Sequence, residues 1–273
     1  MNILLIFLLA IAAGSLSTLF WIPEDDMGRG YFQMNALVIL GFLGIAATVI
    51  LFHAPLNSTA RSSGTGPALV VALAGAFAYY AAVWREQWSL GRWAVAVSLL
   101  ATSWALIAAG ILLTSGASTA SLPYRPLLLG LGLLSSALIL GWSLITMLLG
   151  HWYLVVPKLT LRHLVVFCWI LLGTVVLRIA AVASSAMIAM STPGSSYPSD
   201  WQILIGFAGH GVFFWFRLLW GLAIPLTLSL MSLHCARRGA NQSATGILYV
   251  LVVGTFIGEI TSFYLTLTTS IPV

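Results

Sequence analysis

The chain has 273 residues, of which 60% are hydrophobic and only 6% charged, and its formal net charge is +5. A soluble domain carries about a quarter charged residues, so a soluble fold is excluded and an integral membrane protein is indicated. The 11 basic residues are scattered, without the basic run or stripe of a nucleic-acid interface, so no nucleic-acid partner is expected.

Eight apolar runs are each long enough to cross a bilayer core of about 30 Å as a helix. The first run precedes the first charged residue, Glu24, and lacks the basic start of a signal peptide, so it is expected to remain as a span. The expected fold is an all-α bundle that forms one polytopic domain over residues 1–273. Its spans are placed near residues 2–21, 34–54, 67–84, 93–114, 126–149, 163–190, 202–235 and 245–268.

The connections between these spans differ in charge. The odd-numbered connections hold seven Arg and Lys residues, whereas the even-numbered ones hold only Arg61 and Arg125. The positive-inside rule therefore places both termini on the non-cytoplasmic side, in a multi-pass protein of a bacterial inner (cytoplasmic) membrane. Every connection is short, and no P-loop, GxGxxG or HExxH motif occurs, so any chemistry must take place within the membrane or on a partner protein.

Ionisable residues interrupt the last three spans. Arg178 lies in the sixth span, His210 and Arg217 in the seventh, and Glu259 in the eighth. Counted at 1.5 Å per residue, the two arginines and Glu259 each lie about 21–23 Å along their spans. Because successive spans are antiparallel, Arg178 and Glu259 are expected to lean toward the outside and Arg217 toward the inside, all near the middle third.

Helical periodicity predicts that these residues face the bundle interior. Polar residues share the face of Arg178 and of Glu259, and small residues share the face of Arg217. Pro225 cannot donate a hydrogen bond to Gly221, so a kink is expected in the seventh span just beyond Arg217. The predicted faces are Thr174, Arg178 and Ser185; Gly206, His210, Phe213, Phe214, Arg217 and Gly221; and Thr255, Glu259, Ser262 and Thr266.

Two interpretations of these charges remain open. In one, Glu259 neutralises an arginine in a buried ion pair that only fixes helix packing. In the other, the surplus positive charge meets an anionic or carbonyl-bearing ligand, or Glu259 and His210 relay protons, because ionisable groups inside membranes usually mark functional sites.

Two stretches at the inner face are secondary candidates. His151, Trp152, Tyr153 and Lys158 follow the fifth span and are typical either of an interfacial anchor or of the mouth of a quinone or lipid-headgroup site. Gln242 lies where the eighth span begins, in a turn that either caps the helix or holds an anionic group.

A heme would need two histidines at matching depth. His53 and His210 match poorly, and His151, His163 and His234 lie at the inner ends of their spans, so interfacial histidines without a ligand are the simpler interpretation. No metal site is predicted, and Cys168 and Cys235 are expected to be free thiols, since neither belongs to a CxxC motif.

Three functions are compatible with this pattern. The leading hypothesis is a subunit of a respiratory or other electron-transfer complex that holds a quinone-like ligand and handles protons through Arg178, His210, Arg217 and Glu259. Redox partner subunits would then supply the electrons. The alternatives are a secondary transporter for a small anion or organic acid, and a structural or assembly protein without catalysis. The sequence does not indicate whether the protein is an enzyme.

Overall fold

The computed structural model describes residues 2–22, 27–53, 64–114, 125–156, 161–191, 206 and 211–269. In this part of the chain the secondary structure is helical and includes no strand. Seven helices are α1 (Asn2–Thr18), α3 (Arg29–Phe52), α5 (Thr65–Trp84), α6 (Trp88–Thr114), α7 (Arg125–Val155), α8 (Arg162–Ser191) and α12 (Asn241–Thr269). An eighth consists of α10 (Gly211–Leu218), the π-helical turn η1 (Leu219–Ala223) and α11 (Ile224–Arg237). The predicted all-α membrane bundle is therefore confirmed.

Seven of these helices are long and apolar enough to cross a membrane. The exception is α1, whose 17 residues rise about 25 Å and fall just short of a bilayer core. The helices follow the predicted spans in order, and most extend beyond them at one or both ends, although α1 ends at Thr18 and α3 at Phe52, before their predicted ends at 21 and 54. Thus α7 continues to Val155, and α3 already begins at Arg29.

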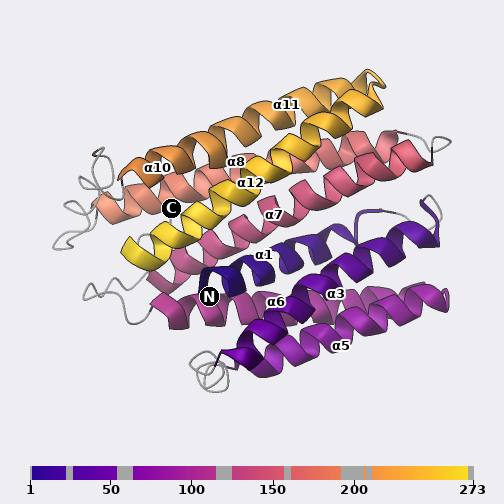
Figure 1. Cartoon of the computed structure of the whole chain (residues 1–273), viewed down its shortest axis with the longest axis horizontal. Coiled ribbons are helices and arrows are strands. Elements are labelled where there is room, and N and C mark those ends of the chain that lie inside the picture. Colours follow the sequence, from indigo (N-terminus) through magenta and orange to yellow (C-terminus); the bar gives the residue numbers. More distant parts are fainter. Residues whose placement is uncertain are drawn as a thin grey trace.

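The helices lie side by side, and both termini lie at the same end of the bundle (Figure 1). We call this the terminal end. The opposite end carries the turns 85–87 and 238–240, and we call it the basic end because most of the described Arg residues lie there. These are Arg29, Arg85, Arg92, Arg162, Arg237 and Arg238. The placement of the basic end in the cytoplasm remains a prediction.

The centre of the bundle is formed by α1 and α7. Helix α1 packs against α3, α6, α7 and α12, which bury it on all sides, as expected for a helix that is apolar all round. Gly14 of α1 meets Gly141 of α7, and a Cβ atom added to either glycine would overlap the backbone of the other helix. Small residues at this crossing therefore allow the close contact that joins the two halves of the chain.

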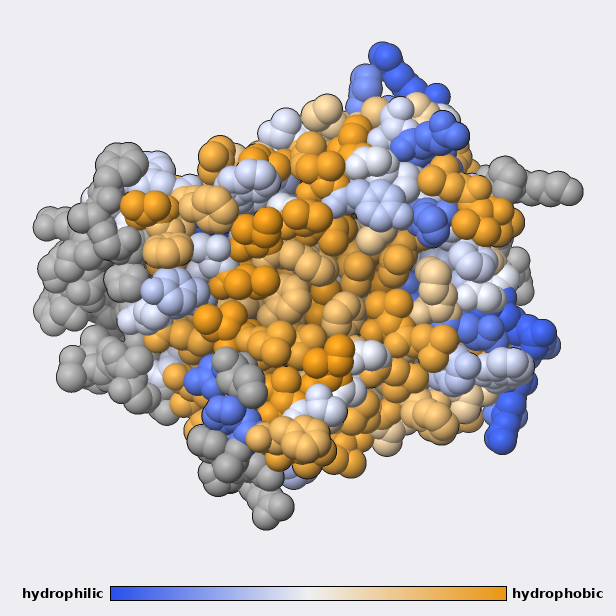
Figure 2. All heavy atoms as spheres, in the orientation of Figure 1, coloured by the Kyte–Doolittle hydropathy of each residue, from blue (hydrophilic) through white to orange (hydrophobic). Residues whose placement is uncertain are grey.

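The outer surface is apolar around the middle of the bundle and hydrophilic mainly at the basic end (Figure 2). Large apolar side chains stand exposed along the outer surface, among them Phe52, Trp93 and Leu100. Such a continuous apolar surface is stable only against lipid, so the protein is a multi-pass membrane protein in contact with the bilayer.

Candidate functional site

Three charged side chains from three helices meet inside the bundle, between α8, α10 and α12. Arg178 Nη2 lies 3.0 Å from Glu259 Oε2, and Arg217 Nη2 lies 2.8 Å from Glu259 Oε1. All three side chains are almost completely buried. We call Arg178, Glu259 and Arg217 the ionic triad. One carboxylate thus forms ion pairs with two guanidinium groups, and the triad has a formal surplus of one positive charge.

The predicted helical faces mostly account for this meeting. On α12, Thr255, Ser262 and Thr266 are buried together with Glu259, and on α8 Thr174 and Ser185 are buried with Arg178. On α10 and η1, Phe214, Arg217 and Gly221 are buried as expected. Phe213, however, is 47% exposed, so its predicted place on the inward face is wrong. Its ring contacts Tyr264 of α12, with the two ring centroids 5.3 Å apart, so Phe213 lies at the margin of the buried face.

The depth predicted for Arg217 is also wrong. Counted from the basic end, Arg217 lies about 30 Å along its helix, Glu259 about 27 Å and Arg178 about 24 Å. All three therefore lie in the half of the bundle nearer the terminal end. The prediction erred because it counted from residue 202, whereas the described helix begins at Gly211 and extends to Arg237.

The guanidinium group of Arg178 is well provided with acceptors. Its Nε and Nη2 atoms donate to the two carboxylate oxygens of Glu259, at 3.2 and 3.0 Å. Nη2 also donates to Ser262 Oγ at 2.8 Å, and Nη1 donates to Ser135 Oγ and to the carbonyl of Gly132, both at 3.3 Å. Every nitrogen of this side chain has an acceptor, which is how a charge is stabilised in an apolar interior.

Arg217 differs sharply from Arg178. Its Nη2 atom donates to Glu259 Oε1 at 2.8 Å, but among the described residues its Nε and Nη1 atoms have no hydrogen-bond partner. The residue is nevertheless only 1% exposed. A buried donor without an acceptor costs about 1–3 kcal/mol, and more when it is charged. The unpartnered side of Arg217 is therefore the least satisfied part of the triad.

Glycine provides the space for the Arg217 guanidinium. A Cβ atom at Gly221, one turn further along, would overlap Arg217 Nη1, and it would also lie 2.9 Å from the Cα atom of Gly258 on α12. A Cβ atom at Gly258 would in turn overlap Gly221. The helices thus cross at two glycines, and Arg217 lies directly beside this crossing.

Near Pro225, where a kink was predicted, the helix has a π-helical turn, η1, between Arg217 and Pro225. The N–H group of Ile224 donates to the carbonyl of Leu219, five residues earlier, instead of four. Because Pro225 has no N–H group, the helix widens here without losing a further bond.

A cavity of about 10 Å³ adjoins the triad on the side of Arg178. Gly132, Ser136, Ser262 and Thr266 contribute to its lining. This volume accommodates roughly one water molecule. The contribution of α7 was not predicted, although its Gly132, Ser135 and Ser136 follow a helical spacing of small and polar residues that indicates an interior face.

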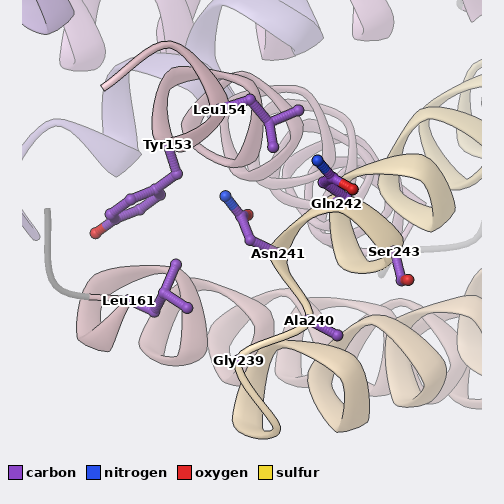
Figure 3. A pocket seen from close by; sticks show the side chains of 8 residues that line it. All are labelled: Tyr153, Leu154, Leu161, Gly239, Ala240, Asn241, Gln242 and Ser243. Atoms are coloured by element: carbon purple, nitrogen blue, oxygen red, sulfur yellow. The ribbon is translucent and has the colours of Figure 1, made fainter. Parts of the chain in front are cut away.

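The secondary candidates lie elsewhere. Tyr153 and Gln242 line a pocket of about 590 Å³ at the basic end, together with Leu154, Leu161, Gly239, Ala240, Asn241 and Ser243 (Figure 3). Tyr153 lies about 30 Å along α7 from Gly132, so this pocket and the triad are separate. His151 instead contacts the hydroxyl of Tyr249 through Nδ1 at 3.2 Å, and Trp152 packs on Tyr31.

His210 and Lys158 lie outside the described residues. His53 lies at the terminal end of α3, whereas His151, His163 and His234 lie near the basic end. Within the described ranges, no three His, Cys, Asp or Glu side chains gather so that they could hold a metal ion. Cys168 and Cys235 are free thiols, as predicted.

Comparison of the chain with protein-family models, with curated proteins and with solved structures found no match.

Proposed function

We propose that this membrane protein binds a small anion at the unpartnered side of Arg217 and acts as a secondary transporter of that anion or of a small organic acid. One observation supports this most directly: Arg217 is buried, carries the surplus charge of the triad, and has two nitrogen atoms without an acceptor among the described residues.

The physical argument begins from the fixed charge of arginine. A guanidinium group remains protonated in proteins, so the surplus charge is not removed by loss of a proton. Within a membrane such a charge is expensive unless a partner or water reaches it. An anion bound at Nε and Nη1 would neutralise the triad and accept the free hydrogen bonds at once.

The surroundings of Arg217 favour a small ligand that arrives with a local movement of the helix. Helix α10 packs mainly on α12 and continues directly into η1, so it lies at the edge of the bundle. The widened turn and the Gly221–Gly258 crossing give this segment a place at which it can shift. Glu259, which binds both arginines, would then couple anion binding to the position of α10.

A quinone-binding subunit of an electron-transfer complex is the second candidate. It is favoured by the aromatic, lipid-facing side of α10, where Phe213, Trp215 and Phe216 are partly exposed beside Arg217. A quinone carbonyl would accept from the same Arg217 donors, and partner subunits would supply the electrons. The cavity of about 10 Å³ lies on the side of Arg178 and favours neither ligand at Arg217. We prefer the anion because it would neutralise the surplus charge of the triad, whereas a neutral quinone carbonyl would leave that charge in place.

Proteoliposomes that contain only the full chain provide the test. Uptake of chloride, phosphate and succinate is measured separately, for the native protein, for Arg217→Met and for the control Arg29→Met. Arg29 is a suitable control because it lies 51% exposed at the basic end. We expect saturable uptake of at least one of these anions, at least tenfold slower in Arg217→Met and unchanged in Arg29→Met.

The other outcomes identify the competing functions. A quinone that co-purifies with the native protein and is lost from Arg217→Met would replace the transporter by the electron-transfer subunit. No uptake of any of the three anions and no bound quinone, with Arg217→Met folded and at least as stable, would assign the triad to helix packing alone.

A further inference from the structure

The pocket at the basic end is a second, separate cavity of ligand size. Its volume is about 590 Å³, within the range of small-molecule sites. Three of the described segments line it: the last turn of α7 with Tyr153 and Leu154, the start of α8 at Leu161, and the turn from Gly239 to Ser243 that leads into α12 (Figure 3). The pocket is therefore formed where three helix ends meet at one face of the bundle.

The α12 side of the pocket offers several hydrogen-bond donors. The amide of Asn241 projects into the space between α7 and α8, and its Oδ1 atom accepts from Thr245 at 3.3 Å, which leaves the Nδ2 end toward the cavity (Figure 3). The backbone N–H groups of Gln242 and Ser243 have no acceptor among the described residues, whereas that of Ala244 donates to Ala240. These free amides lie at the positive end of a 29-residue helix.

The charges around the pocket have one sign. Arg162 and Arg238 directly adjoin the lining residues Leu161 and Gly239 in the chain, and both are exposed. Of the two acidic side chains that the structure describes, Glu259 belongs to the triad and Glu86 pairs with Arg29 at 3.0 Å. Neither lines the pocket, so an anion there meets donors and positive charge without a described carboxylate.

The walls of the pocket are partly apolar. Leu154 and Leu161 line it opposite the amide groups, and Leu154 is 41% exposed on the outer surface of the bundle. Apolar walls do not help to bind a free inorganic anion, whereas an amphiphile places its polar group against the amides and its apolar part along the leucines. Basic pockets between helix ends at this depth of a membrane are suited to anionic lipid headgroups.

From these features we propose that the basic-end pocket is a binding site for the headgroup of an anionic phospholipid. The phosphate accepts from the Gln242 and Ser243 backbone N–H groups and from the Asn241 amide, and Arg162 and Arg238 attract it electrostatically. This site is independent of the anion proposed at Arg217, because about 30 Å of helix separates the two.

The test uses the full chain in detergent micelles and measures binding of short-chain phosphatidylglycerol and, separately, of phosphatidylcholine with the same acyl chains. Gln242→Glu places a negative charge at the pocket. Gln87→Glu is its matched control, since Gln87 is an exposed glutamine in the turn between α5 and α6 at the same end. We expect phosphatidylglycerol to bind at least tenfold more tightly than phosphatidylcholine, with this preference lost in Gln242→Glu and kept in Gln87→Glu.

Three results would overturn the proposal. The first is equal binding of the two lipids, and the second is an equal loss in both variants, which would indicate a general charge effect. The third is displacement of phosphatidylglycerol by an equal concentration of inorganic phosphate, which would make the pocket a site for a free anion. Melting temperatures of both variants establish that each is folded.

Discussion

Arg178 and Arg217 bind the same carboxylate and both donate to its Oε1 atom, yet the protein surrounds them differently. Arg178 lies between α7, α8 and α12, where Gly132, Ser135 and Ser262 add acceptors to those of Glu259. Arg217 lies on α10 at the edge of the bundle, where one oxygen of Glu259 is its described acceptor.

This difference indicates where the surplus charge of the triad is located. Five hydrogen bonds stabilise the Arg178 guanidinium in place, and together with Glu259 it forms a neutral, well-satisfied pair. The unneutralised charge and the unpartnered donors therefore both belong to Arg217. One shared carboxylate thus binds a fully hydrogen-bonded arginine and an arginine with unpartnered donors.

Removal of the shared carboxylate should have the largest effect. Glu259→Gln leaves two buried guanidinium groups facing each other without a counter-charge, and loss of one partner of a buried pair costs about 3–5 kcal/mol. We expect at least this loss in the free energy of unfolding, measured by titration with sodium dodecyl sulfate in mixed micelles. Glu86→Gln is the control, because its pair with Arg29 is exposed and should leave stability almost unchanged. Equal effects of the two substitutions would mean that the triad is not buried as described.

Separate replacement of the two arginines tests the comparison directly. Arg178→Met should cost about 2–3 kcal/mol, because it removes the hydrogen bonds that Arg178 donates to Ser262, Ser135 and the Gly132 carbonyl while Glu259 keeps Arg217. Arg217→Met should change stability by less than about 1 kcal/mol or increase it, since it removes two unsatisfied donors and leaves a neutral pair.

The same titration measures both variants. If Arg217→Met is the more destabilising of the two, then Arg217, and not Arg178, is the better hydrogen-bonded arginine of the triad. Arg178→Met also provides a check on function: its effect on anion uptake should follow its loss of folded protein, whereas Arg217→Met should lose uptake while folded.

Composition and apolar run length were sufficient to predict an all-α bundle of eight helices, because a bilayer admits few other architectures. The same periodicity predicted that Arg178, Arg217 and Glu259 face inward, and a single anion between two cations made their meeting plausible. These inferences depend on local spacing, which the sequence displays directly.

Other features depend on where the helices are placed relative to one another, and local spacing did not reveal them. The depth of Arg217 was wrong because it depended on where its helix begins. The acceptors on α7, and the separation of Tyr153 and Gln242 from the triad, follow from packing between distant segments. Periodicity indicates which face of a helix is buried but not which helix covers it.

The glycine crossing beside Arg217 tests the two sides of the triad through packing instead of charge. In Gly258→Ala the new methyl group overlaps the backbone of Gly221, and overpacking of this kind costs about 1–3 kcal/mol. Gly254→Ala lies one turn away on the same face of α12, where its methyl group would meet Trp220 O at 3.5 Å and Ile224 Cγ2 at 3.8 Å, which is ordinary contact. Gly254→Ala should therefore leave stability unchanged or raise it slightly, since alanine favours a helix more than glycine does.

We also expect Gly258→Ala, but not Gly254→Ala, to weaken anion uptake, because displacement of η1 moves Arg217 while the hydrogen bonds of Arg178 to α7 remain. Equal uptake in the two variants would show that the position of Arg217 does not depend on this crossing. The hydrogen bond from Arg217 to Glu259 of α12 would then have to fix the position of Arg217 by itself.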